Sequence, residues 1–116
     1  MGKRPNTDRK YKNKLHYDLD VVVYEEGKYY VSYCPALDLS SFGISKEDAL
    51  ESFNEAFDIF MEDIIEKGTL DKVLKSLGWI VLNTPKKTYR PPYPNLQEIF
   101  ERRPVDVSRK AITVND

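Results

Sequence analysis

The segment LHYDLDVVVYEEGKYYVSYC, residues 15–34, decides the fold, because its apolar side chains recur at every second position on both sides of one glycine. This period of two predicts two strands that form an antiparallel hairpin. We expect a three-residue loop, 25–27, in which Gly27 adopts the left-handed conformation of a bulge. The large apolar residues of both strands then share the core face. The expected pairs are Val23 with Tyr29, Val21 with Val31 and Leu19 with Tyr33.

The residues after the hairpin predict a short strand and then a long helix. A turn at Pro35 leads to a third strand over residues 39–42. Ser45, followed three residues later by Asp48, is typical of a capping box, and the helix is expected to run over 46–67 and to end before Gly68. Its apolar residues recur at spacings of three and four, so one side of it should lie on the sheet. These residues are Ala49, Leu50, Phe53, Ala56, Phe57, Phe60, Met61, Ile64 and Ile65.

The last third of the chain predicts smaller elements. Residues 69–76 are typical of a short helix and residues 79–83 of a fourth strand. Four prolines within 84–94 exclude a helix there and favour an extended linker. A brief helix over 96–102 follows. In the last predicted strand the apolar residues change from odd to even positions at 108–110, as a bulge would cause.

These elements predict an α+β fold in one domain with two extensions. A flexible basic arm is expected over residues 1–14, and a folded domain over 15–83 contains a small, mainly antiparallel sheet. Three strands, a long amphipathic helix on one face of the sheet and a further strand make up this domain. Residues 84–116 form a Pro-rich linker, a short helix and a terminal strand that packs back on the domain or swaps into a second subunit.

Length and composition exclude several classes of protein. The chain has 116 residues, of which 41% are apolar and 32% charged, and no segment is apolar enough to span a membrane. The basic opening has no apolar run behind it, so no signal peptide is expected. One cysteine cannot form an internal disulfide. We therefore expect a cytoplasmic protein.

The charge is divided unevenly along the chain. Residues 21–82 carry five Lys/Arg against twelve Asp/Glu, a balance of −7, whereas the residues before and after them each have a balance of +3. An acidic centre argues against general nucleic-acid binding by the central fold and favours a basic partner.

Most of the acidic residues fall on one face of the predicted long helix. They follow one another at spacings of three and four, with no Lys or Arg between positions 46 and 67. Repulsion along this face costs about 1 to 2 kcal/mol. Two interpretations fit: a docking surface for a basic protein, and a solvated face that keeps the chain soluble. We name this face the acidic ridge; it comprises Glu47, Glu51, Glu55, Asp58, Glu62 and Glu66, and the expected partner-binding residues are Glu51, Glu55, Asp58, Glu62 and the neighbouring Ile59.

The sequence does not predict an enzyme. His16 is the only histidine and has no evident nucleophile or carboxylate pair to act with. Cys34 lies in no nucleophile motif, and exposed strand carboxylates are the simplest interpretation of Asp18 and Asp20. No catalytic residue, metal site or cofactor is expected.

Basic residues near the C-terminus form the basis of an alternative hypothesis, a transcriptional regulator that binds nucleic acid. One helix follows the linker, whereas a helix-turn-helix needs two. The region matches no complete DNA-binding motif. The candidate residues are Lys86, Lys87, Arg90, Arg102 and Arg103.

Residues 30–53, YVSYCPALDLSSFGISKEDALESF, resemble the HicB antitoxin family. The order and spacing of Tyr33-Cys34-Pro35, Leu37-Asp38, Phe42-Gly43 and Glu47-Asp48-Ala49-Leu50 match that family's pattern, with Ser45 where Thr is frequent. The resemblance covers about residues 15–83 and implies a partial RNase H-like fold. It also implies a HicA-like partner, a small basic RNA-cleaving toxin that is occluded by binding, and a protein that forms homo-dimers or larger homo-oligomers.

Overall fold

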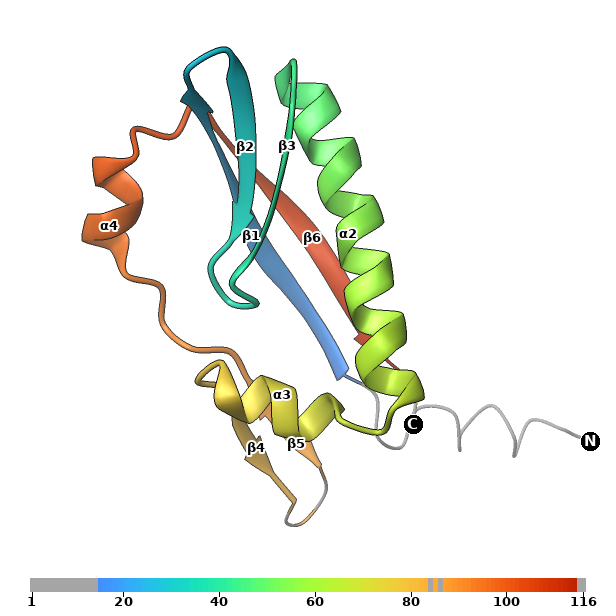
Figure 1. Cartoon of the computed structure of the whole chain (residues 1–116). Helices are drawn as coiled ribbons and strands as arrows, with labels where there is room; N and C mark the ends of the chain where they lie inside the picture. The colour runs from blue at the N-terminus through green and yellow to red at the C-terminus, as the bar shows by residue number, and fades with distance from the viewer. Residues whose placement is uncertain (1–14, 84, 86, 115–116) are drawn as a thin grey trace, which may run out of the picture.

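The main body of the protein is a four-stranded antiparallel sheet with one long helix across it (Figure 1). The structure is a computed structural model that describes residues 15–83, 85 and 87–114. The strands lie in the order β3-β2-β1-β6. The expected α+β fold is confirmed. Its elements are β1 (Leu15–Glu26), β2 (Tyr29–Cys34), β3 (Leu39–Gly43), the long helix α2 (Lys46–Glu66) and β6 (Asp106–Val114).

The hairpin of β1 and β2 has a different register from the predicted one. Glu26 pairs with Tyr29 across a two-residue turn, and Val23 pairs with Ser32 in place of Tyr29. Gly27 has a φ of 62°, so its left-handed conformation is as expected. The observed register puts the small side chains of Ser32 and Cys34 under α2 and turns Tyr29 and Tyr33 to the other face. The predicted register was wrong because it assumed that the largest side chains fill the core.

Small residues let the first turns of α2 lie very close to the sheet. Ser32 Oγ, fully buried, donates a hydrogen bond of 2.8 Å to the carbonyl oxygen of Ala49. A Cβ atom added to Gly43 would lie 2.6 Å from the Ala49 nitrogen. At the helix start the Asp48 amide donates to Ser45 Oγ and the Ile44 amide donates to Asp48 Oδ2. The capping prediction and the predicted extent of the helix are therefore confirmed.

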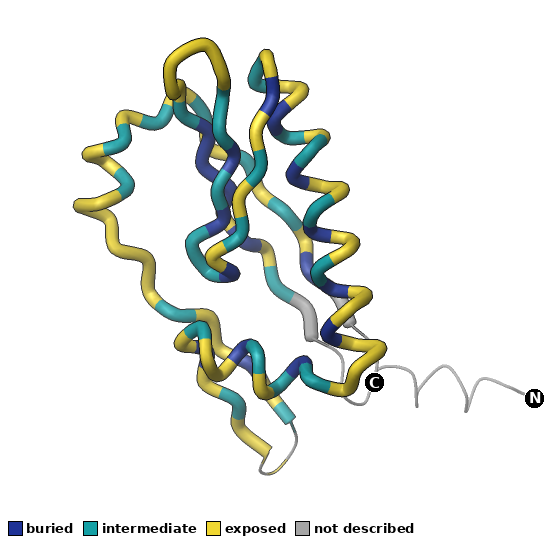
Figure 2. The backbone as a smooth tube through the Cα atoms, viewed as in Figure 1, coloured by how far each residue is buried: buried dark blue, intermediate teal, exposed yellow. Residues whose placement is uncertain are grey.

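The core lies between the inner side of α2 and the middle of the sheet (Figure 2). Apolar side chains that recur along α2 meet those on the helix-facing side of β1, as the helical period predicts. Ile65 is an exception, because 42% of its side chain is exposed. The central core residues are Leu19, Val21, Cys34, Leu37, Phe53, Phe57, Met61, Ile64 and Ile112.

The predicted fourth strand does not join the main sheet. After the helix α3 (Leu70–Ser76), β4 (Ile80–Leu82) pairs with β5 (Thr88–Arg90) in a separate two-stranded sheet. Burial of Trp79 and Tyr89 explains this position, since both rings join the core next to α3. The Trp79 indole donates a hydrogen bond of 2.7 Å to the Ala36 carbonyl. The Pro-rich segment therefore includes a strand, which the sequence did not predict.

The C-terminal strand β6 is the fourth strand of the main sheet. The chain reaches it through the short helix α4 (Leu96–Glu101), which arches away from the sheet (Figure 1). All nine residues of β6 pair with β1, from Asp106 opposite Val23 to Val114 opposite Leu15. The bulge expected at 108–110 is absent from this ladder. The apolar side chains of Val107 and Ile112 instead point to opposite faces of the sheet. Different parts of the chain cover these two faces.

No helix in the described ranges, 15–83 and 87–114, is long and apolar enough to cross a membrane.

Gly43→Ala tests the close packing of α2 on β3. The added methyl group would meet backbone atoms of Asp48 and Ala49, which cannot move independently of the helix. We expect a loss of about 2 to 3 kcal/mol in the free energy of unfolding, measured by urea denaturation. Ser40→Ala, at an exposed position of the same strand, is the control and should change it by less than about 0.5 kcal/mol. Equal effects of the two substitutions would contradict the close packing.

Candidate functional site

The acidic ridge is exposed along the whole of α2. All six of its carboxylate residues are exposed, and none forms an ion pair with another described residue. Lys67, the residue that follows α2, pairs with Asp63 at 2.9 Å, outside the ridge. Ile59 lies next to the ridge with 70% of its side chain exposed. The five predicted partner-binding residues therefore form one continuous surface on a single helix.

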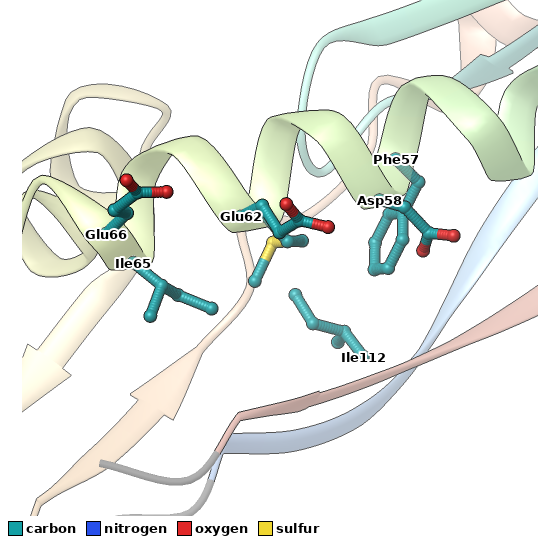
Figure 3. A pocket seen from close by; sticks show the side chains of 7 residues that line it. Phe57, Asp58, Glu62, Ile65, Glu66 and Ile112 are labelled. Atoms are coloured by element: carbon teal, nitrogen blue, oxygen red, sulfur yellow. The ribbon is translucent and has the colours of Figure 1, made fainter.

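One side of the ridge borders a groove between α2 and β6, which we name the α2–β6 groove (Figure 3). It has a volume of about 450 Å³. The groove exists because α2 packs over β2 and β3, so that β6 at the sheet edge is left uncovered by the helix. Its floor is apolar but mostly buried, since Ile112 is fully buried and Phe57 and Met61 nearly so, and three carboxylates line its helix side. The lining residues are Phe57, Met61, Ile65 and Ile112, together with Asp58, Glu62 and Glu66.

A cation already lies near one end of this groove. The Nζ atom of Lys110, on β6, is 4.8 Å from the centroid of the Phe57 ring. An ammonium group over an aromatic face is attracted by the negative potential of the ring. The Phe57 face at this end of the groove is therefore already occupied by a cation of the protein itself.

Two of the C-terminal cations predicted to bind nucleic acid are engaged within the protein. Lys87 Nζ lies 2.8 Å from Asp71 Oδ2. The Arg102 guanidinium lies over the rings of Tyr24 and Tyr33, donates to the Tyr24 hydroxyl at 2.7 Å, and pairs with Glu98. Arg90 and Arg103 are exposed on different elements, and Lys86 lies outside the described residues. The four described cations lie in two places, Lys87 and Arg90 at β5 and Arg102 and Arg103 after α4.

Asp71 is the centre of a small polar cluster between α3 and β5. Its carboxylate accepts hydrogen bonds of 2.8 Å from Lys87 Nζ and from the Tyr89 hydroxyl. Burial raises the pKa of Asp71, but the hydrogen bonds and charge of its partners outweigh burial and lower the pKa below its usual value. The ionised form of Asp71 therefore stabilises the attachment of β5.

The other candidates for chemistry are arranged as structural groups. Cys34 is fully buried, and burial raises the pKa of its thiol to about 11, so the reactive thiolate is scarce at neutral pH. Asp20 pairs with Arg109 of β6 at 3.3 Å on the exposed face of the sheet. The His16 side chain lies outside the described part. Among the described residues, no three His, Cys, Asp or Glu side chains are placed to hold a metal ion.

A second exposed apolar surface lies near the tip of the hairpin. Tyr29 and Phe42 pack edge to face with ring centroids 5.7 Å apart, and each is at least half exposed. Tyr29 was expected in the core, and Phe42 was expected in the third strand, where it lies. The register of β2 explains the difference, because it places both rings on the face away from α2.

The sequence could not predict the α2–β6 groove. Glu62 and Glu66 belong to a pattern visible in the sequence, but Ile112 comes from a strand whose partner was unknown. The last strand did contain one indication. Its apolar residues change from odd to even positions between Val107 and Ile112. The change shows that each face of β6 meets a different environment.

Comparison of the chain with known protein families, with curated proteins and with solved structures finds no match.

Asp71→Asn tests the polar cluster. Because the folded pKa is lowered, the ionised carboxylate contributes stability above its unfolded pKa of about 4, and this contribution disappears as the pH falls through the folded pKa. At pH 7 we expect a loss of about 1 kcal/mol in the free energy of unfolding, a value reduced for partial exposure of the side chain.

Urea denaturation at pH 7 and at pH 3.5 measures this loss. Asp63→Asn is the control, because its ion pair with Lys67 is more exposed and should contribute less than about 0.5 kcal/mol. A loss for Asp71→Asn that is as large at pH 3.5 as at pH 7 would contradict the role of the charge.

Proposed function

We propose that the protein is a HicB-like antitoxin, or a protein derived from one, that binds and occludes a small basic HicA-like toxin. The proposal combines the resemblance of residues 30–53 with the exposed acidic ridge. The ridge is the observation that carries it, since six carboxylates without a described cationic partner lie along one helix. In this proposal the protein acts in the cytoplasm by binding and has no catalytic activity.

A basic partner would relieve the charge repulsion along the acidic ridge. Like charges at helical spacings of three and four destabilise α2 when the protein is alone. A basic partner removes this repulsion on binding and is attracted over several ångströms before contact, which raises the rate of association. Ile59 would add an apolar contact beside the charges.

The fold provides a fixed base for such a surface. The side of α2 opposite the ridge is held by Ala49, Phe53 and Phe57, which are buried against the sheet. Binding a partner therefore requires little ordering of the helix, and less conformational entropy is lost.

Nucleic-acid binding through the C-terminal cations has less support. Lys87 and Arg102 already bind Asp71, Glu98 and the tyrosines of the sheet. Deletion of residues 84–116 would be a poor test, because it would remove β6 from the main sheet and expose β1. Substitution of the exposed Arg90 and Arg103 tests this alternative without such damage.

The test of the proposed function is reversal of three ridge charges, Glu51→Lys, Glu55→Lys and Asp58→Lys, in one variant. The tagged full chain is used to capture partners from the source cells at low and high salt, and association with the captured protein is then measured by surface plasmon resonance. We expect a small basic protein in stoichiometric amount with the unaltered chain. The variant should associate about tenfold or more slowly, with a weaker dependence on salt.

A matched control has the same change in charge at exposed sites away from α2, namely Glu25→Lys, Glu26→Lys and Glu101→Lys. Its association rate should fall much less. The ridge variant should fold, because the new cations at 51 and 58 lie one turn from Glu47 and Glu62. Equal binding by the ridge variant and the unaltered chain would show that the ridge is only a solvated face.

A further inference from the structure

A cavity lies between the short helix α4 and the face of the sheet turned away from α2; we name it the α4 cavity. Its volume is about 290 Å³, close to the lower end of the range for ligand pockets. In Figure 1, α4 and the Pro-rich segment before it arch away from this face. Val22 and Val107, which pair across β1 and β6, line the sheet side, and Leu96 and Phe100 line the helix side.

The walls of the α4 cavity are apolar and open to solvent. The exposed fractions are 56% for Leu96, 68% for Phe100 and 55% for Val107, whereas Val22 is buried. A helix normally buries its apolar side, but the apolar side of α4 lines this cavity without filling it. Binding of an apolar group here would remove hydrated apolar surface from water, which is favourable.

The described charges that line the α4 cavity are all negative. Asp18 and Asp20 line it from β1, on the same face as Val22, and no described Lys or Arg does so. Asp20 is paired with Arg109 at 3.3 Å, whereas no described residue forms an ion pair with Asp18. An anionic ligand would be repelled and a cationic one attracted. The favoured occupant therefore has an apolar body and one positive charge.

The volume of the α4 cavity limits the size of this occupant. The share of one water molecule in the liquid is about 30 Å³, so the cavity has room for about ten non-hydrogen atoms. Asp20 lies two residues from Val22 along β1, or about 7 Å. A single ring with a three-carbon arm that ends in an ammonium group fits both the volume and this separation.

We propose that the α4 cavity binds a small primary amine with an aromatic or branched alkyl body. The body lies between Phe100 and Val107, and the ammonium group lies at Asp18 and Asp20. The acidic ridge is on α2, which covers the other face of the sheet, so the cavity and the ridge are separate surfaces. The proposal therefore does not depend on the proposed function.

The test is titration of the full chain with 3-phenylpropylamine at pH 7, followed by nuclear magnetic resonance of the backbone amides and methyl groups. 3-Phenylpropan-1-ol, of equal size but uncharged, and the anion 3-phenylpropanoate are the comparison ligands. For the amine we expect saturable shifts at Val22, Leu96, Phe100 and Val107 and a dissociation constant of about 1 mM or lower. The alcohol should bind about fivefold more weakly, and the anion more weakly still.

Two variants separate the contributions of charge and apolar surface. Asp18→Asn/Asp20→Asn should weaken binding of the amine about fivefold and change binding of the alcohol by less than about twofold. Phe100→Ala should weaken binding of both. The side chains of Asp20 and Phe100 are more than half exposed, so these changes leave the core intact.

Each variant has a matched control outside the cavity. Asp58→Asn/Glu62→Gln removes two exposed carboxylates from α2, and Phe42→Ala removes an exposed ring from β3. Neither control should change the binding of the amine or of the alcohol.

Four results would overturn the proposal. The first is the absence of saturable shifts at the four cavity residues up to about 10 mM amine. The second is equal affinity for the amine and the alcohol, and the third is an amine affinity that Asp18→Asn/Asp20→Asn leaves unchanged. The fourth is a change in the Phe100 and Val107 signals on dilution and not on addition of amine, which would show a second copy of the chain in the cavity. None of these results bears on capture of a basic protein by the ridge, so the two proposals can fail separately.

Discussion

Backbone pairing on both sides of β1 is the constraint on which the rest of the structure depends. β2 pairs with one edge of this strand and β6 with the other, so residues from both ends of the described chain are held in one sheet. The segment between β5 and β6 must therefore return across the far face of the sheet. Arg102 holds it there through Tyr24 and Tyr33. The C-terminal extension is thus part of the fold and not an appendage to it.

The position of α2 follows from the same sheet and creates the candidate functional surfaces. Ser32 and Gly43 allow the helix to lie close to β2 and β3, which leaves β6 uncovered. The outer side of the helix is then the acidic ridge, and its side toward β6 borders the α2–β6 groove. Close packing at the start of the helix therefore sets the positions of both the acidic ridge and the α2–β6 groove.

Local signals in the sequence predicted the elements that depend on local physics. The cap at Ser45, the extent of α2, the third strand and the exposure of the ridge are set by periods and caps that a single segment contains. Contacts between distant segments were not predictable in this way. The pairing of β6 with β1, the separate sheet of β4 and β5, and the exposure of Tyr29 all depend on which strand lies beside which. The groove was missed for the same reason, because Ile112 and Ile65 belong to it only once β6 is placed.

Amide hydrogen exchange, measured residue by residue by nuclear magnetic resonance, tests the central claim that β1 is an interior strand held by β6. The account predicts that the hydrogen-bonded amides of β1 within 19–24, which pair with β6 up to Val23 and with β2 from Val22 onward, exchange as slowly as the core amides of α2, through global unfolding alone. The hydrogen-bonded amides of β6 within 107–112 should be protected by a similar factor. Rapid exchange of the β6 amides, together with protection of only one edge of β1, would show that β6 does not pair with β1 and would contradict the account.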